Sequence, residues 1–148
     1  MKLSQITIPS CITSIGFYAF SECLSLSQIT FLMPSSLNSI GGYAFNKCSL
    51  LTHLSIPSSV TTIGSYTFSE CSSLVQILLP SSLVSIESFA FDRCTSIVQI
   101  KIPSSVESIG SGAFSECSSL TQIEFENNSR VASIANYTFD QCYSLKRI

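Results

Sequence analysis

Residues 51–73 read LTHLSIPSSVTTIGSYTFSECSS, and residues 74–96 read LVQILLPSSLVSIESFAFDRCTS. The two segments share apolar, proline, serine, phenylalanine and cysteine positions at a period of 23. Working outward, the prolines follow one another at intervals of 25, 23, 23 and 23, and they are Pro9, Pro34, Pro57, Pro80 and Pro103. A cysteine column has intervals of 25, 23, 23, 23 and 25, and it comprises Cys23, Cys48, Cys71, Cys94, Cys117 and Cys142. Two residue types with one period indicate a tandem array.

The first third of each unit predicts a β-strand. Apolar residues fill positions 1, 4 and 6, as in Leu51, Leu54 and Ile56, and the alternation at positions 4 and 6 is typical of a strand with one buried face. Pro57 at position 7 ends the strand because proline has no amide hydrogen. A period of 23 lies within the roughly 20–29 residues of leucine-rich repeats, which contribute one strand per unit to a parallel sheet.

We therefore expect residues 1–148 to form a single leucine-rich repeat array, a solenoid with a concave parallel sheet of six or seven strands. Two units are longer, with an interval of 25 in place of 23, and their two extra residues are expected to bulge outward without breaking the stack. The units start near Leu3, Leu26, Leu51, Leu74, Ile97, Leu120 and Leu145.

The rest of each unit predicts the convex side of the core. One phenylalanine per unit occupies a single column, which comprises Phe20, Phe45, Phe68, Phe91, Phe114 and Phe139. The three-residue steps from Phe68 to Cys71 and from Cys71 to Leu74 favour a short helical or 3₁₀ turn, with an irregular segment as the alternative. A glycine column tolerates Glu87, so we expect it to require a small residue more than a positive φ.

Composition excludes several classes of protein. Charged residues make up 11% of the chain, against roughly 25% in ordinary globular proteins, and the net charge is −2. The seven Lys and Arg residues are scattered, whereas nucleic-acid binding needs clustered basic residues. The apolar runs are too short for a bilayer span, and residues 1–5 have no apolar core of a secretory signal.

A longer string carries a family resemblance. The pattern Ile-Pro-Ser-Ser-Val-x-x-Ile-Gly-x-x-x-Phe-x-x-Cys-x-x-Leu occurs at Ile56–Leu74 and again at Ile102–Leu120. It resembles the BspA-type leucine-rich repeat of bacterial and protozoan surface proteins, over essentially the whole chain. The resemblance implies a right-handed curved superhelix used as a surface antigen or adhesion scaffold, with host cells or matrix proteins as partners. It implies no catalytic residues.

The residues themselves predict no catalytic, cofactor-binding or metal site. His53 is the only histidine, and its row otherwise contains mainly glutamine, which predicts an exposed position on the sheet. No close cysteine pair of the C-x-x-C kind is present to hold zinc. Acidic residues of the convex side are expected to be solvated, and they are Glu22, Glu70, Asp92, Glu116 and Asp140.

The cysteine column predicts buried free thiols. Parallel side chains on neighbouring turns keep their Cβ atoms about 5 Å apart, farther than the roughly 3.8 Å that a disulfide prefers. Cys11 stands in another column, occupied elsewhere by serines such as Ser59. We expect it to be a small inward residue at the turn, with an exposed, oxidisable thiol as the alternative. Asn127 and Asn136 begin N-x-S/T sequons, whose glycosylation the sequence leaves open.

The outward strand positions predict where a protein ligand binds. Position 3 is nearly uniform glutamine, whereas position 5 varies, and its C-terminal members Leu78, Lys101 and Glu124 bring an exposed apolar group and two opposite charges. A varying face on a fixed scaffold can carry selectivity, so we expect the site in the C-terminal half of this face. The candidate residues are Gln28, Thr30, His53, Ser55, Gln76, Leu78, Gln99, Lys101, Gln122 and Glu124.

Two functions from different classes follow. A cell-surface or extracellular adhesin agrees with the resemblance, whereas a cytoplasmic protein-interaction scaffold agrees with unpaired thiols and the lack of a signal. In both cases the chain is expected to bind protein, without a small-molecule substrate. Polar capping units are missing from both ends, which predicts a fragment of a longer array that self-associates end to end.

Overall fold

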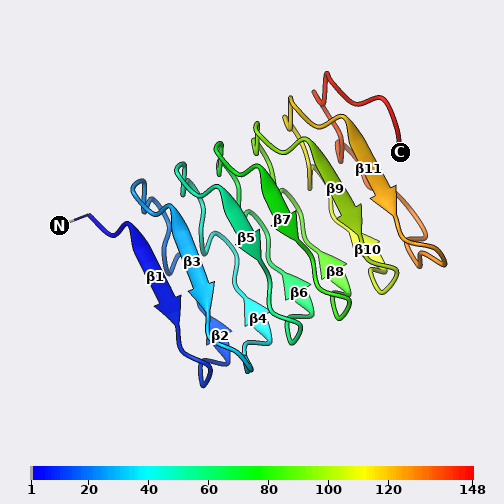
Figure 1. Cartoon of the computed structure of the whole chain (residues 1–148). Helices are drawn as coiled ribbons and strands as arrows, with labels where there is room; N and C mark the ends of the chain where they lie inside the picture. Colours follow the sequence, from blue (N-terminus) through cyan, green and yellow to red (C-terminus); the bar gives the residue numbers. More distant parts are fainter. Residues whose placement is uncertain (1) are drawn as a thin grey trace.

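The computed structural model describes residues 2–148 as a stack of similar turns, one for each repeat (Figure 1). Most turns contribute two short strands, which lie in two rows. The longer strands are β1 (Gln5–Ile8), β3 (Gln28–Phe31), β5 (His53–Ser55), β7 (Gln76–Leu78), β9 (Gln99–Ile102) and β11 (Gln122–Phe125). The two-residue strands are β2 (Ser14–Ile15), β4 (Ser39–Ile40), β6 (Thr62–Ile63), β8 (Ser85–Ile86) and β10 (Ser108–Ile109).

Equivalent repeat positions pair across neighbouring turns. All ladders are parallel, and they join β1 to β3, β5 to β7 and β9 to β11, with Gln99 opposite Gln122 in the last pair. The seventh unit contributes only a bridge from Arg147 to Gln122. Strands β3 and β11, which precede the two insertions, are both formed. The predicted repeat solenoid with parallel strands is therefore confirmed, but the long strands form three two-stranded ladders in place of one continuous sheet.

The row of two-residue strands was not predicted from the sequence. It forms one continuous parallel sheet in the order β10-β8-β6-β4-β2. Each member pairs an outward Ser or Thr with an inward isoleucine, and Ile63 and Ile86 are almost fully buried. Two alternating residues are too short a pattern to distinguish a strand from a turn in sequence, because the pairing depends on the neighbouring turn.

The convex segments contain no helix anywhere in residues 2–148, so the irregular alternative is correct there. The reason is a backbone of alternating hand, in which Tyr43 and Lys47 adopt left-handed φ values of 56° and 59°. The amide of Ala44 donates within its own turn to the Gly41 carbonyl at 3.2 Å, whereas that of Phe45 donates to Thr67 in the next turn at 2.9 Å. Half of the amides in this segment are therefore used to join turns, which a helix cannot do.

Left-handed backbone occurs in two convex columns of the repeat. The first is the aromatic column, Tyr18, Tyr43, Tyr66, Phe89 and Tyr137, with Gly112 replacing an aromatic ring at φ 63°. The second comprises Glu22, Lys47, Glu70, Arg93, Glu116 and Gln141. Such φ values cost about 1–2 kcal/mol in a residue other than glycine, so stacking between turns must offset the cost. The rings of Tyr18 and Tyr43 stack at 4.7 Å, as do those of Tyr43 and Tyr66.

The glycine column instead provides close approach between turns, as expected. Its members do not have positive φ, and a Cβ at Gly64 would lie 2.7 Å from the Gly42 nitrogen. At Gly110 it would lie 2.5 Å from the Ser88 nitrogen. Glu87 fits this column because its carboxylate turns back over the preceding turn, where it accepts hydrogen bonds from the amide and hydroxyl of Ser65.

The phenylalanine column belongs to the core on its convex side, as predicted. Phe45, Phe68, Phe91 and Phe114 have no exposed surface. Their rings stack face to face through the array, with centroids 5.6 Å apart for Phe45 and Phe68 and 5.5 Å apart for Phe68 and Phe91. Each ring is thus covered by a ring of the turn before and a ring of the turn after.

The cysteine column is a ladder of free thiols. The Cys71 thiol donates to the Phe45 carbonyl of the preceding turn at 3.2 Å, and Cys94 donates to Phe68 at 3.1 Å. Burial raises the pKa of Cys48 to about 12 and raises the pKa values of Cys71, Cys94, Cys117 and Cys142 above the ordinary thiol value. The buried thiols predicted from the sequence are confirmed at these five positions, while Cys23, in the first turn, is only half-buried.

Two sequence expectations were wrong. Cys11 is exposed, as in the alternative interpretation, because its thiol makes no hydrogen bond within residues 2–148, whereas Ser82 and Ser105 of the same column donate to carbonyls of the preceding turn. Asp92 is buried, since its column packs under the convex turn, where Ser69 donates to its carboxylate. Burial raises the pKa of Asp92, against the hydrogen bond from Ser115 and the charge of Arg93.

We predict that Phe68→Ala lowers the free energy of unfolding by about 3–5 kcal/mol, because it removes a ring packed on both faces and leaves a cavity. Phe17→Ala is the matched control, since that ring is 74% exposed, and it should change stability by less than about 0.5 kcal/mol. Urea unfolding followed by circular dichroism measures both variants. Equal losses would show that the stacked phenylalanine column does not stabilise the core.

We also predict that stability falls from about pH 9 upward. The buried thiols have raised folded pKa values, so between the ordinary value of 9.0 and the folded value only the unfolded chain ionises. The buried neutral thiols contribute fully to the free energy of unfolding below pH 9. Above pH 9 this free energy falls by about 1.4 kcal/mol per pH unit for each thiol. Unfolding in urea from pH 7 to 10.5 under reducing conditions measures the slope.

Cys94→Ala removes one such thiol. Above pH 9 the slope of unfolding free energy against pH should therefore be smaller by the contribution of one proton, whatever the effect of the substitution at neutral pH. Cys11→Ala should leave the slope unchanged because Cys11 is exposed. Equal slopes in Cys94→Ala and the parent would contradict a role for the buried column.

Candidate binding face

Strand alternation places the ten candidate residues on one side of the longer strands. In β9, Gln99 and Lys101 are exposed, while Ile100 and Ile102 are buried. The pattern repeats in the other strands, and all ten candidate residues are exposed except Gln122, which is half-buried. His53 lies opposite Gln76 in the ladder, as its position in the glutamine row predicted. We call this side, formed by the outward residues of β1, β3, β5, β7, β9 and β11, the long-strand face.

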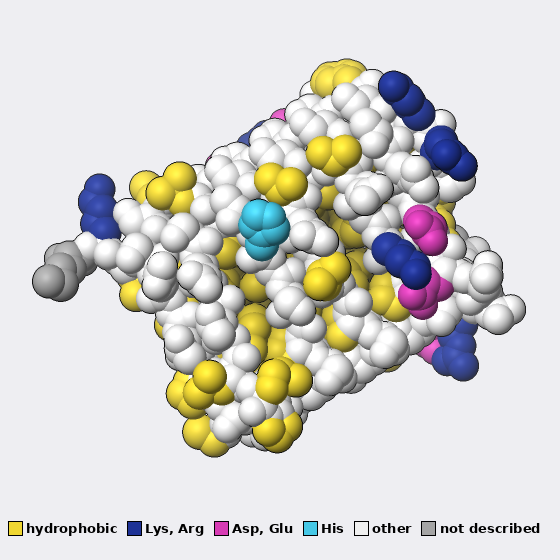
Figure 2. Space-filling model, viewed as in Figure 1, with side chains coloured by type: hydrophobic (Ala, Val, Ile, Leu, Met, Phe, Trp, Pro, Cys, Tyr) yellow, Lys and Arg dark blue, Asp and Glu magenta, His cyan; other side chains and the backbone are white. Residues whose placement is uncertain are grey.

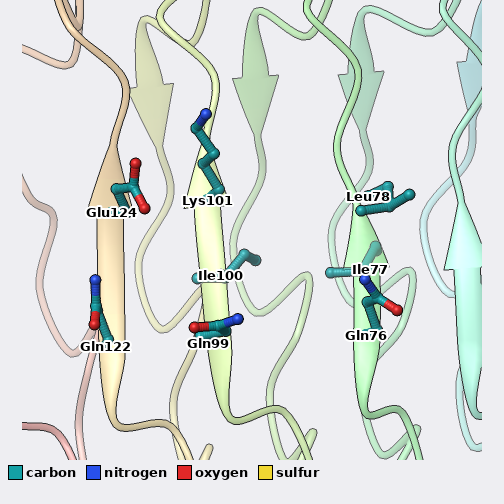
Figure 3. Close-up of a pocket in the computed structure, with 8 residues that line it drawn as sticks. All are labelled: Gln76, Ile77, Leu78, Gln99, Ile100, Lys101, Gln122 and Glu124. Atoms are coloured by element: carbon teal, nitrogen blue, oxygen red, sulfur yellow. The ribbon is translucent and has the colours of Figure 1, made fainter.

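The face is hollowed between β7 and β9. Residues of β7, β9 and β11 line a hollow of about 190 Å³, and these residues are Gln76, Ile77, Leu78, Gln99, Ile100, Lys101, Gln122 and Glu124. Figure 3 shows β7 and β9 set farther apart than β9 and β11, with Ile77 and Ile100 directed into the space between them. In the described chain no ladder joins β7 to β9, and none joins β3 to β5. Widening of the row therefore opens a depression with an apolar floor.

A second, smaller hollow of about 140 Å³ lies on the other side of β7, against β5. It is lined by His53, Leu54 and Ser55 of β5 together with Gln76 and Leu78. Leu78, of which 55% is exposed, thus stands between two depressions. The structure brings together six of the ten candidate residues around the larger hollow, whereas Gln28, Thr30, His53 and Ser55 lie outside it.

The charges of this face are only partly compensated. Lys101 and Glu124 are register partners in the ladder, yet the Lys101 ammonium pairs with Glu126 at 3.2 Å. Glu126 also accepts a hydrogen bond from the Ser104 amide at 3.1 Å, and this bond and Lys101 lower the pKa of its carboxyl. In the part of the chain that is described, Glu124 forms no ion pair. Figure 2 shows the charged side chains over the strands gathered on the C-terminal side.

Sequence reasoning missed Glu126 and the two floor isoleucines. Glu126 is one of the two extra residues after β11, so it belongs to no repeat column and has no equivalent to compare with. Its acidic side chain two residues after Glu124 was the available signal. Ile77 and Ile100 were assigned to the core, and they are indeed 6% and 3% exposed. Only the separation of the strands makes them the floor of a hollow.

Residues 2–148 show neither a metal site nor a membrane-spanning helix. No cluster of three His, Cys, Asp or Glu side chains there could hold a metal ion. None of the described segments is a helix long and apolar enough to cross a membrane.

The stacked turns and the row of parallel strands define a leucine-rich repeat protein. A structure from Bacteroides ovatus, described as a leucine-rich repeat protein, is 37% identical, with a TM-score of 0.84 over 96% of this chain and 38% of its own. A leucine-rich cell surface protein of Faecalibacterium prausnitzii is 36% identical, with a TM-score of 0.63 over 83% of this chain and 39% of its own. The pneumococcal vaccine antigen PcpA is 30% identical, with a TM-score of 0.77 over 85% of this chain and 31% of its own.

The chain belongs to the family described as BspA type Leucine rich repeat region (6 copies), whose profile matches residues 1–83 and 63–148. The resemblance seen in the sequence is thereby confirmed. Repeat proteins of this class are in general protein-binding scaffolds without catalytic activity. The chain spans less than two fifths of the length of the three structures described above. No curated protein matches it in sequence.

Proposed function

We propose that this chain is a non-enzymatic binding array of a cell-surface adhesin, and that its long-strand face attaches to a host-cell or matrix protein. The observation that carries the proposal is the hollow between β7 and β9, where the varying residues Leu78, Lys101 and Glu124 meet. Two of the similar structures support the location, one described as a cell surface protein and the other as a vaccine antigen.

The size of the face favours multivalent attachment. Six strands about 4.8 Å apart and about 13 Å long give an area of roughly 400 Å², half of the roughly 800 Å² per partner in a standard protein interface. A single array of this length should therefore bind weakly. Many copies on one surface would raise the avidity without any new contact.

A cytoplasmic scaffold is the second candidate, and its supporting observation is the set of seven free cysteines. Unpaired thiols are typical of proteins in reducing compartments. Five of the thiols are buried, however, and burial makes a thiol inert in an oxidising compartment as well. Labelling of intact source cells with an antibody to this array separates the two candidates. Staining only after permeabilisation would contradict the surface proposal.

We predict that Leu78→Asp combined with Lys101→Glu lowers attachment to host cells or coated matrix proteins at least tenfold. The substitutions replace the exposed apolar group and reverse a cation beside the hollow. Val84→Asp combined with Arg130→Glu is the matched control, because it changes charge equally, removes an exposed valine and breaks the exposed Arg130–Glu107 pair away from this face.

The measurement is attachment of fluorescent beads coated with each variant, after circular dichroism has shown that each is folded and light scattering has measured end-to-end self-association. The control pair should attach like the parent. Equal attachment by all three proteins would exclude the long-strand face as the adhesive surface.

A further inference from the structure

The two strand edges that face the hollow between β7 and β9 carry unpaired main-chain groups. Strand β7 pairs with β5, and β9 pairs with β11. Within residues 2–148, no main-chain hydrogen bond joins residues 74–80 to residues 97–103. Each strand therefore presents a free edge to the other. Amides and carbonyls on such edges need hydrogen-bonding partners, which this chain does not supply.

Ile77, Gln99 and Lys101 provide these groups. Successive residues of a parallel strand direct their amides and carbonyls to alternate sides. The Leu78 carbonyl accepts a hydrogen bond from the preceding turn at 3.1 Å, so the amide and carbonyl of Ile77 face β9. The Ile102 carbonyl accepts a hydrogen bond from the following turn at 3.0 Å, so the amides and carbonyls of Gln99 and Lys101 face β7.

Free strand edges select the conformation of a ligand. A helix uses its amides and carbonyls within itself, whereas an extended segment has free amides and carbonyls on both of its sides. An extended segment between β7 and β9 would bond to both edges and continue the row of long strands. It would also direct every second side chain inward, beside Ile77 and Ile100 at the floor of the hollow.

The turns stay joined elsewhere when these two strands separate. An inserted strand requires β7 and β9 to lie about 9.6 Å apart, twice the usual strand spacing. They are already set farther apart than β9 and β11 (Figure 3). On the other sides of the same turns, Ser85 pairs with Ser108, and the Phe91 amide donates to the Ala113 carbonyl at 2.8 Å. These bonds can hold the stack together while the long-strand side opens.

We infer that an extended segment of a protein partner inserts between β7 and β9 as an additional strand. The inference rests on the proposed function, and it names the conformation and the side-chain pattern of the partner for that same face. Pairing of the long strands also stops between β3 and β5. The site is placed between β7 and β9 because the hollow of about 190 Å³ lies there.

The neighbouring side chains specify the segment. An outward residue between Gln76 and Gln99 should be a glutamine, because amide side chains of adjacent strands hydrogen bond in ladders. The next residue points inward between Ile77 and Ile100 and should be apolar. A variable residue and a second apolar residue complete the pattern. The array itself has this pattern in β1, whose sequence at Gln5–Ile8 is QITI.

The test is titration of the folded chain with a fluorescent nine-residue peptide, KLSQITIPS, which has the sequence of residues 2–10. A control peptide, KLSQSTSPS, replaces both inward isoleucines by serine. Two further peptides carry a single N-methyl group, one on the amide of the first isoleucine and one on that of the following threonine. These two amides point to opposite sides of an extended segment, so a strand bonded on both sides needs both.

Three protein variants locate the peptide. Lys101→Pro removes a main-chain donor that faces β7, and it should weaken binding at least fivefold. Lys101→Ala is the first control, because it removes the side chain and its ion pair with Glu126 but retains the amide. Ser55→Pro is the second control, because its amide faces the other unpaired gap, between β3 and β5. Both controls should bind like the parent, after circular dichroism has shown that each variant is folded.

The expected result is binding of KLSQITIPS to the parent, with losses of at least tenfold for KLSQSTSPS and for each N-methyl peptide. Three results would overturn the inference. The first is no binding of KLSQITIPS at about 1 mM. The second is sensitivity to only one of the two N-methyl groups, which would indicate addition to a single edge. The third is equal binding by Lys101→Pro and the parent, which would place the peptide elsewhere, for example at an end of the stack.

The outcome is separable from that of the proposed function. Attachment that depends on Leu78 and Lys101, without binding of KLSQITIPS, would retain the adhesive face and reject the inserted strand. Binding of the peptide in the expected pattern, without attachment to host cells or matrix proteins, would retain the inserted strand and reject adhesion.

Discussion

Hydrogen bonding between the main chains of neighbouring turns is the interaction on which the rest of this structure depends. In the convex segment, Phe45, Phe68 and Phe91 each donate their amide to the next turn at 2.8–2.9 Å. These bonds fix equivalent residues at one spacing, and the stacked phenylalanine rings and the thiol ladder follow from that spacing. The left-handed backbone at Tyr43 and Lys47 is the cost of directing alternate amides out of their own turn.

A fixed stack restricts the residues that face inward more than those that face outward. Columns that face inward must hold one shape in every turn, because each side chain packs against its own equivalent. Outward strand positions have no such restriction, and there Thr7, Thr30 and Ser55 are followed by Leu78, Lys101 and Glu124. Pairing of the long strands stops between β3 and β5 and again between β7 and β9, and at the second place the same scaffold also acquires a hollow. The proposed binding face thus consists of departures from the repeat.

What the sequence predicts correctly follows the same division between inward columns and outward positions. The period of Pro57, Cys71 and Phe68 was enough to predict the strand positions and the buried columns, because periodic burial leaves a periodic sequence. The same reasoning gave a wrong position for Cys11, whose column is inward only where a preceding turn supplies a carbonyl. It also predicted wrongly that Asp92 is exposed to solvent. The sequence does not distinguish a buried carboxylate, such as this one hydrogen bonded by Ser69, from a solvated one.

By itself the sequence determined the solenoid, its family and the side of the strands that faces outward, since each depends on spacing along the chain. Tertiary structure alone decided the continuous sheet from β2 to β10, the separation of β7 from β9, and the pairing of Lys101 with Glu126 in place of Glu124. These features depend on distances between turns. Residues one repeat apart in the sequence become neighbours only when the stack forms, and small displacements there decide which groups bond and which remain open.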